Sequence, residues 1–306
     1  MRRHQARHSA PAPQHPGTGN GGERLVAPIS ERIGLIAGGG SFPLLFAAEA
    51  KKAGREVFVV ALNDITAKEL EQYAAQTRWF RLGNVGGPID YLRDSGVKKV
   101  LIVGSIPHVN IFGGILPDLR AAKLLFKLRD KKAGAIFTAV AEEFAQDGME
   151  IVSSATLLEH LLVKPGLISG KKPDADTLKT AAFGWKAAKA LSAFDVGLTV
   201  VLRDQVVLAA EGLEGTDACI KRAGEILKKL GKGHPMTVVK VARPAQDMRF
   251  DLPVAGASTL RAMAEAGAHT LVIEAGKTLI LGMEDFLAAA KDTNITVLGA
   301  DDTTFT

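Results

Sequence analysis

The segment ARPAQDMRFDLPVAG, residues 242–256, has a dense set of side chains that could bind a ligand or take part in catalysis. Charged and apolar residues alternate in it. A proline near each end biases the residue before it toward an extended conformation. If the part between the prolines is extended, Asp247, Arg249 and Asp251 lie on one face, opposite the apolar side chains. Two carboxylates and a guanidinium on one face could hold phosphate oxygens and a metal ion. A solvated edge strand would show the same alternation.

The spacing of the two aspartates limits what they can do together. In an ideal strand Asp247 and Asp251 are roughly 13 Å apart, too far to bind one ion. Either the segment bends, or other carboxylates complete the site. VVLAAEGLEGTDA supplies Glu211, which ends a strongly apolar run, and Asp217 near a helix start. The alternative interpretations are an ion pair between Glu211 and Lys240 and compensation of the helix dipole by Asp217.

The composition narrows the choice of metal. The histidines are scattered, without the spacing of a zinc site. The only cysteine, Cys219, excludes an internal disulfide and a cysteine-rich metal site. Any metal is therefore expected to be a hard ion held by carboxylates and phosphate oxygens, Mg²⁺ or Mn²⁺.

A second candidate is the glycine-rich stretch GLIAGGGSFP, which begins at position 34. It predicts a tight turn from a buried strand into a helix, with Ser41 as cap and Pro43 in the first turn. The free N–H groups of such a helix start favour an anion. The dinucleotide fingerprint, however, has glycine where Pro43 stands. Phosphate binding and a plain turn are both open.

The elements around these candidates alternate between strand and helix from Ile33 onward. This predicts an α/β fold, with a Rossmann-like, doubly wound parallel sheet in residues 31–165. TAKELEQYAAQ is expected to be a helix, and Gly104 ends a strand beside the glycine turn. A lysine-, glycine- and proline-rich segment then marks a domain boundary. Residues 175–306 are expected to form a second α/β domain with a mixed sheet, in which Thr216 caps a helix.

The chain ends and the charge add weaker constraints. Residues 1–30, rich in proline, glycine, histidine and arginine, are expected to be a disordered arm without a secretory signal. No apolar run is long enough to span a membrane. The formal net charge of +5 suits acidic ligands or anionic headgroups but does not choose among them.

Several of these segments together resemble a known family. VVLAAEGLEGTDACIKRAG, VVKVARPAQDMRFDLPVAGASTL and AGAHTLVIEAGKTLIL closely resemble the UDP-2,3-diacylglucosamine pyrophosphatases of lipid A biosynthesis, the LpxI type. IGLIAGGGSFP and VLIVGSIP resemble the N-terminal half of that family. The match runs from about Arg32 to Gly299. The EGTD and QDxRxDLP motifs are specific, whereas GGG alone is not.

The resemblance implies a two-domain, Mg²⁺-dependent hydrolase that is cytoplasmic and peripheral at the inner membrane face. It would cleave the pyrophosphate of UDP-2,3-diacylglucosamine to UMP and 2,3-diacylglucosamine 1-phosphate, lipid X. We expect no nucleic-acid partner, and a homodimer is left open. The apolar loop SIPHVNIFGGILPDL, which ends at Leu119, is expected either to line the lipid entrance or to be a buried loop core.

The resemblance and the residue patterns together give a set of candidate site residues. The predicted catalytic residues are Asp251 and Asp247. The predicted metal ligands are Asp251, Asp247, Glu211 and Asp217. The predicted substrate-binding residues are Gly38, Gly39, Gly40, Ser41, Gly104, Lys240, Gln246, Arg249 and Thr216.

The sequence also departs from the family pattern. Gly134 is retained, but Ala135 and Ile136 stand where the resemblance leads us to expect acidic residues. One alternative is therefore a divergent or non-catalytic paralogue that binds lipid or nucleotide. The other is a nicotinamide-dependent oxidoreductase built on the glycine turn, with Asn63 and Asp64 near the position of a ribose-binding acid.

Overall fold

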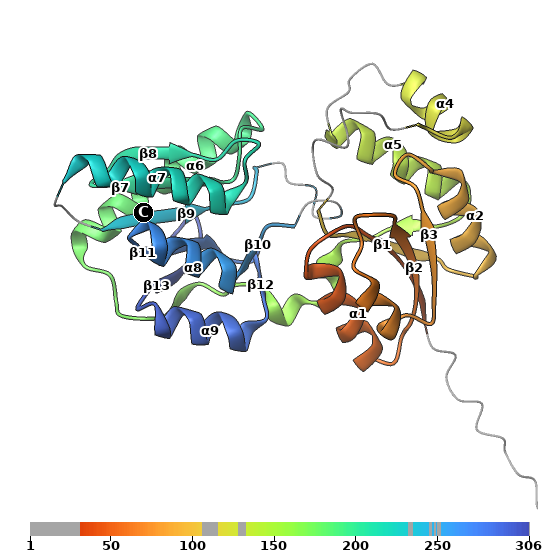
Figure 1. The fold of residues 1–306 in the computed structure, drawn as a ribbon, viewed down its shortest axis with the longest axis horizontal. Coiled ribbons are helices and arrows are strands. Elements are labelled where there is room, and N and C mark those ends of the chain that lie inside the picture. The colour runs from red at the N-terminus through yellow and green to blue at the C-terminus, as the bar shows by residue number, and fades with distance from the viewer. Residues whose placement is uncertain are drawn as a thin grey trace, which may run out of the picture. The chain divides into compact units, whose positions relative to one another are not determined.

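The computed structural model describes residues 31–105, 116–127, 133–231, 235–244, 247, 249 and 252–305. The N-terminal arm, the loop of residues 106–115, Gln246 and Asp251 lie outside the described residues. The described chain contains a five-stranded sheet, a six-stranded sheet and a two-stranded sheet (Figure 1).

The N-terminal sheet is parallel throughout, in the strand order β3-β2-β1-β4-β5. Its strands are β1 (Arg32–Ala37), β2 (Glu56–Leu62), β3 (Gln76–Phe80), β4 (Lys99–Val103) and β5 (Glu150–Ile151). The helices beside it are α1 (Phe42–Lys52), α2 (Gly86–Asp94), α4 (Leu119–Lys127) and α5 (Ala133–Gln146). The order and direction of the strands confirm the doubly wound parallel sheet.

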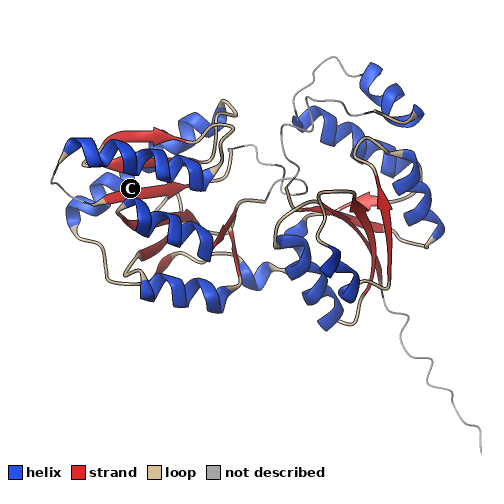
Figure 2. Cartoon of the chain, in the orientation of Figure 1, coloured by secondary structure: helices blue, strands red, loops and turns tan. Residues whose placement is uncertain are grey.

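Alternating side chains of β1, β2 and β4 are buried on both faces of the sheet. Val59 packs in the apolar cluster that includes α1, whereas Val60 packs in the cluster that includes α2 and α5. Leu101 and Val100 on β4 divide between the two clusters in the same way. A strand covered on both faces has no polar face, which explains why these segments read as continuous apolar runs. Figure 2 shows helices beside the sheet.

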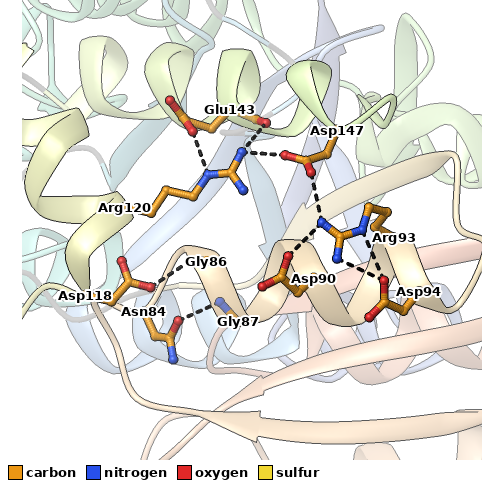
Figure 3. Close-up of polar contacts among 10 residues, drawn as sticks. All are labelled: Asn84, Gly86, Gly87, Asp90, Arg93, Asp94, Asp118, Arg120, Glu143 and Asp147. Carbon is orange, nitrogen blue, oxygen red and sulfur yellow. Dashed lines mark hydrogen bonds and ion pairs between the residues drawn. The ribbon is translucent and has the colours of Figure 1, made fainter.

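A chain of ion pairs joins α2, α4 and α5 on one side of this sheet (Figure 3). Arg120 of α4 binds Glu143 of α5 at 2.7 Å and also Asp147, just beyond α5. Arg93 of α2 binds Asp147 at 3.1 Å. Asp118 accepts hydrogen bonds from the backbone N–H groups of Val85 and Gly86 at the start of α2. Asp147 is thus the carboxylate that two arginines from different helices share.

We predict that Asp147 stabilises the fold except at acid pH. The hydrogen bond from Arg120, and then that from Arg93, lower the pKa of Asp147 from its ordinary value of 3.8. Because the pKa is lowered by folding, the stabilisation is present above about pH 4 and is lost as the pH falls through the lower folded value. Asp147→Asn should lower the melting temperature at pH 7, and the difference from the parent should shrink below pH 4.

The control for this experiment is Glu265→Gln, because the Glu265 side chain is 69% exposed and its ion pair is 3.9 Å long. Calorimetry of both variants from pH 7 to pH 3 gives the comparison. Equal melting temperatures of Asp147→Asn and the parent at pH 7 would contradict the prediction.

The C-terminal sheet is mixed, in the order β6-β13-β11-β9-β7-β8. Its strands are β6 (Gly166–Ser169), β7 (Thr199–Arg203), β8 (Val206–Ala210), β9 (Met236–Lys240), β11 (Ala268–Glu274) and β13 (Thr296–Ala300). Strands β9, β11 and β13 are parallel, β7 is antiparallel to β9 and β8, and β6 is antiparallel to β13. This confirms the second α/β domain with a mixed sheet. The separate two-stranded sheet pairs β10 (Val254–Gly256) with β12 (Leu279–Leu281).

Helices cover both faces of this sheet as well. They are α6 (Ala175–Ala193), α7 (Thr216–Leu230), α8 (Ala257–Ala266) and α9 (Met283–Asp292). Val238 packs in the cluster that includes α7, α8 and α9, and its neighbour Val239 packs in the cluster that includes α6. We call these the α7 face and the α6 face. Because strand residues alternate, each charged residue at a strand end is assigned to one of the two faces.

Four sequence expectations differ from the structure. Gly166–Ser169, expected in the boundary segment, forms β6 because it pairs with β13. TAKELEQYAAQ contains a 3-10 helix at Lys68–Tyr73, since Ala74 is already extended on the way into β3. Ser41 precedes α1 without a side-chain capping bond. Gly215, with φ of 84°, is the N-cap of α7 in place of Thr216. The division into domains at 165 and 175 stays a prediction.

Candidate functional site

One edge of the C-terminal sheet gathers the charged strand ends. Strands β8, β9 and β11 run in the same direction, so their carboxyl ends lie at one edge. Glu211 follows β8, Lys240 ends β9 and Glu274 ends β11. We call this the carboxyl-end edge. In open α/β sheets ligands bind at such an edge.

Lys240 lies at the centre of this edge and is buried, with 8% of its surface exposed. It pairs with Thr199 of β7 on one side and with Ile273 of β11 on the other. Two residues after Val238, its side chain belongs to the α7 face. There its Nζ donates to Oγ1 of Thr216, the first residue of α7, at 2.7 Å.

The hydroxyl of Thr216 connects this lysine to a carboxylate. Thr216 Oγ1 donates to Oε1 of Glu211 at 3.0 Å and lies 3.3 Å from Oγ1 of Thr199. Oε2 of Glu211 accepts from the backbone N–H of Leu198 at 3.3 Å. The structure thus brings the predicted residues Glu211, Thr216 and Lys240 together, with Thr216 between the two charges.

Asp217 is hydrogen-bonded to a threonine, whereas a metal site would need further metal ligands beside it. Its Oδ1 accepts from Oγ1 of Thr259 on α8 at 2.9 Å, and so joins α7 to α8. Cys219, two residues after Asp217 on α7, is buried, and this burial raises its pKa to about 12. The thiol is therefore protonated at neutral pH and is a poor nucleophile.

Glu274 belongs to the same edge but to the α6 face, two residues after Val272. It is 3% exposed, and its carboxylate binds Lys189 of α6 at 2.6 Å and Lys277 at 2.9 Å. Its Oε2 also accepts from the backbone N–H of Ala242 at 2.7 Å. Glu274 therefore fixes the backbone where β9 leads into the segment of Asp247. Glu274 is not among the residues predicted from the sequence, although it ends an apolar strand, as Glu211 follows one.

The predicted catalytic segment is held near both of its ends. Arg243 binds Asp195, which has a φ of 58°, at 2.6 Å. At the far end, the carbonyl of Pro253 accepts from the backbone N–H of Leu279 at 2.9 Å. Of the three charged residues expected on one face, Asp247 and Arg249 are described and Asp251 is not.

Asp247 and Arg249 bind one another. The guanidinium of Arg249 donates to both carboxylate oxygens of Asp247, and the backbone N–H of Arg249 donates to Oδ1 at 3.1 Å. The latter bond makes a local turn, so the two residues do not follow an extended strand. The side-chain hydrogen bond from Arg249 lowers the pKa of Asp247. Asp247 is therefore ionised at neutral pH and is a weak proton acceptor.

The glycine turn brings the ends of β1 and β4 together. The N–H of Gly38 donates to the carbonyl of Val103 at 2.7 Å, and that of Gly39 donates to Ser105 at 2.8 Å. A Cβ on Gly38 would lie 2.7 Å from the carbonyl oxygen of Ser105. Gly104, with φ of 98°, would place one 2.7 Å from the carbonyl of Gly39. These glycines are required for close packing, and the amides of Gly38 and Gly39 are used within the fold.

The acidic residues that the structure describes do not by themselves form a metal site. Within the described ranges, no three residues among histidine, cysteine, aspartate and glutamate are grouped so that they could hold a metal ion. Glu211, Asp217 and Asp247 each accept hydrogen bonds from protein donors. No helix of the described chain is long and apolar enough to cross a bilayer.

Comparison with known proteins matches the two parts of the chain that hold the large sheets to one family. The model of the LpxI N-terminal domain matches residues 32–161, and that of the LpxI C-terminal domain matches residues 164–298. The chain belongs to the LpxI family. UDP-2,3-diacylglucosamine pyrophosphatase LpxI of Caulobacter vibrioides is 29% identical to it over 276 residues, which are 88% of this chain and 98% of that protein. The chain is thus a homologue of a hydrolase.

Solved structures with partial similarity include biotin carboxylases. The biotin carboxylase subunit of a pyruvate carboxylase has a TM-score of 0.25 and 10% identity, over 69% of this chain and 44% of that chain. A biotin carboxylase from Campylobacter jejuni has a TM-score of 0.26 and 12% identity, over 70% and 45%. The chain spans less than half of each of these structures. At TM-scores this low, the similarity supports no conclusion about fold or function.

We predict that Thr216 stabilises the edge through its hydroxyl. Thr216→Val keeps the shape of the side chain but removes the hydroxyl that lies between Lys240 and Glu211. The free energy of unfolding should therefore fall by about 1–3 kcal/mol. Thr216→Ser keeps the hydroxyl and should stay closer to the parent. Urea unfolding gives the comparison, and equal stabilities of the valine and serine variants would contradict this role.

Proposed function

We propose that the protein hydrolyses the pyrophosphate of UDP-2,3-diacylglucosamine, giving UMP and 2,3-diacylglucosamine 1-phosphate (lipid X), in lipid A biosynthesis. Membership of the LpxI family and the homology to the Caulobacter enzyme support this substrate. We place pyrophosphate binding at the carboxyl-end edge because of one observation. The buried Lys240 is joined there through Thr216 to Glu211.

The charges at this edge suit a pyrophosphate. A pyrophosphate diester must have its negative charge neutralised before water can attack phosphorus. Lys240 supplies one fixed cation, and Arg243 and Arg249 are further cations on the segment that follows β9. One guanidinium group can donate two parallel hydrogen bonds to two oxygens of a phosphate. In this proposal Arg249 divides its donors between Asp247 and the substrate.

The chemical step exchanges one bond to phosphorus for another. The oxygen of water bonds to one phosphorus while the bond from that phosphorus to the bridging oxygen breaks. The bridging oxygen keeps the electron pair of the broken bond and leaves as part of the other product. One proton of the water passes to a carboxylate, and the other stays on the oxygen now bound to phosphorus. We propose Asp251 for that carboxylate, because the lowered pKa of Asp247 makes Asp247 a poor acceptor.

We also propose that the reaction needs Mg²⁺, with Mn²⁺ as the substitute. When bound, the ion would neutralise phosphate charge. The predicted ligands are Asp251 and Asp247, with Glu211 and Asp217 as further candidates. To bind the ion, Asp247, Glu211 and Asp217 would have to exchange their hydrogen bonds to protein donors for bonds to the metal. Purified protein with UDP-2,3-diacylglucosamine and Mg²⁺ should release UMP, and EDTA should stop the release. Saturable lipid binding without turnover would point instead to a non-catalytic paralogue.

Removing Asp251 should affect turnover more than binding. Asp251→Ala is expected to lower kcat by at least about 10²-fold while substrate is still bound, as for loss of a general base. Arg249→Ala should mainly raise KM. The control is Asp176→Ala, since the Asp176 side chain is 71% exposed. Turnover of Asp251→Ala within a few-fold of the parent would shift the assignment to Asp247 or Glu211.

We further propose a cytoplasmic protein in peripheral contact with the inner membrane; a homodimer stays a prediction. The support is an exposed apolar surface at α4. Leu116, Leu119 and Phe126 are 85%, 74% and 93% exposed. Lys123 and Lys127 lie on the same exposed side of α4, opposite the buried Ala121 and Leu124. Apolar side chains flanked by lysines are typical of helices that lie in the surface of an anionic membrane.

Phe126→Asp should therefore weaken sedimentation of the protein with phosphatidylglycerol vesicles several-fold, because it places a negative charge among the apolar contacts. Phe194→Asp is the matched control, since Phe194 is also exposed, at 81%, but lies at the end of α6. Equal losses in the two variants would remove α4 as the contact surface.

A further inference from the structure

A cavity of about 530 Å³ opens at the carboxyl ends of β2 and β3 in the N-terminal sheet. It is lined by Asn63, Asp64, Lys68, Trp79 and Arg81. Asn63 and Asp64 follow β2, whereas Trp79 and Arg81 come from the end of β3 and the residue after it. The cavity thus combines a flat aromatic ring, a carboxylate, an amide and two cations at the edge where parallel sheets bind ligands.

The walls of the cavity are fixed by the fold. The hydroxyl of Thr66 accepts from the backbone N–H of Leu62 at 2.8 Å and donates to the carbonyl of Ala37 at 2.5 Å. The backbone N–H of Asn63 donates to the carbonyl of Phe80 at 2.9 Å. Asp64 between these bonds has a φ of 61°, a conformation that aspartate tolerates better than most residues.

Trp79 is oriented as well. Its Nε1 donates to Oε1 of Glu71 in the 3-10 helix at 2.8 Å. The side chain is partly buried, so its ring has one restrained position from which to stack on a planar group.

The cavity is a neighbour of the glycine turn. A Cβ on Gly39 would lie 3.3 Å from the carbonyl oxygen of Ile65, the residue after Asp64. Thr66 binds Ala37, the last residue of β1, directly. A ligand in the cavity would therefore have the turn from β1 into α1 beside it.

We propose that this cavity binds the pyrimidine nucleotide part of the substrate; the inference rests on the function proposed above. The base stacks on Trp79, the carboxylate of Asp64 and the amide of Asn63 take the ribose hydroxyls and the base edge, and Lys68 and Arg81 attract the phosphate. A nucleotide offers a planar base, ribose hydroxyls and a phosphate, which match the aromatic ring, the hydroxyl acceptors and the cations of this cavity. The acyl chains and the sugar of the substrate would not use all three kinds of group.

Tryptophan fluorescence provides a direct readout, because the chain contains two tryptophans, Trp79 and Trp185. In a Trp185→Phe background, UMP should quench Trp79 in a saturable way. Asp64→Asn, which keeps a residue suited to positive φ, should weaken UMP binding at least about tenfold, the loss of a hydrogen bond to a charged group. Arg81→Ala should weaken UMP binding but leave uridine binding unchanged.

The matched control is Asp204→Asn, since Asp204 also has a positive φ, 51°, but lies in the turn between β7 and β8. UMP binding of this variant should equal that of the parent. Absence of saturable quenching, tighter binding of NADH than of UMP, or equal effects of the two asparagine variants would overturn the inference.

Turnover of UDP-2,3-diacylglucosamine by the same preparations separates this inference from the proposed function. If the parent releases UMP but Asp64→Asn has unchanged KM and unchanged UMP affinity, the inference fails and the function stands. If UMP quenches Trp79 and Asp64→Asn weakens it, but the parent releases no UMP, the inference stands and the function fails.

Discussion

A lysine buried between two strands needs hydrogen-bond acceptors that the surrounding protein must largely supply, and much of the C-terminal sheet is arranged to meet that need. Lys240 is flanked by β7 and β11 and is almost fully covered. Its ammonium meets the hydroxyl of Thr216 because α7 begins with that residue, after the turn at Gly215. That hydroxyl in turn holds Glu211. An uncompensated buried ammonium would be expensive, so these four elements depend on one another.

Strand alternation separates the charges of this edge into two systems. Lys240, Glu211 and Thr199 belong to the α7 face, and Glu274 belongs to the α6 face, where Lys189 binds it. In the second system, the buried Glu274 holds the backbone of Ala242. The first system carries the polar groups that we propose for phosphate, while the second fixes the origin of the segment that carries Asp247. The groups that we propose for phosphate binding and the groups that support the backbone thus lie on opposite faces of one sheet.

The fold could largely be predicted from the sequence because strands buried on both faces read as apolar runs between helices. The strand β6 could not, since its four residues pair with β13 only through tertiary contacts. Similarly, Glu211 and Lys240 could be selected as charges on apolar strands. The hydroxyl between them could not, because its position depends on where α7 begins relative to β9. Glu274 is also a charged residue at the end of an apolar strand, as Glu211 and Lys240 are. The same selection applied to every strand of this edge would therefore have included it.

The glycine turn illustrates the opposite case, in which a sequence signal has a structural cause. Glycine is needed at positions 38 and 104 because the backbones of β1 and β4 approach too closely for a Cβ. A phosphate does not have to be invoked to explain these two residues. The neighbouring cavity around Trp79, which the sequence indicated only through Asn63 and Asp64, offers more ligand-binding chemistry than the turn itself.

The most direct test of the account is a crystal structure of the Asp251→Ala variant with UDP-2,3-diacylglucosamine. We predict that pyrophosphate oxygens lie within hydrogen-bond distance, about 3 Å, of Nζ of Lys240 at the carboxyl-end edge. Pyrophosphate bound elsewhere, with Lys240, Thr216 and Glu211 in contact only with one another, would contradict it.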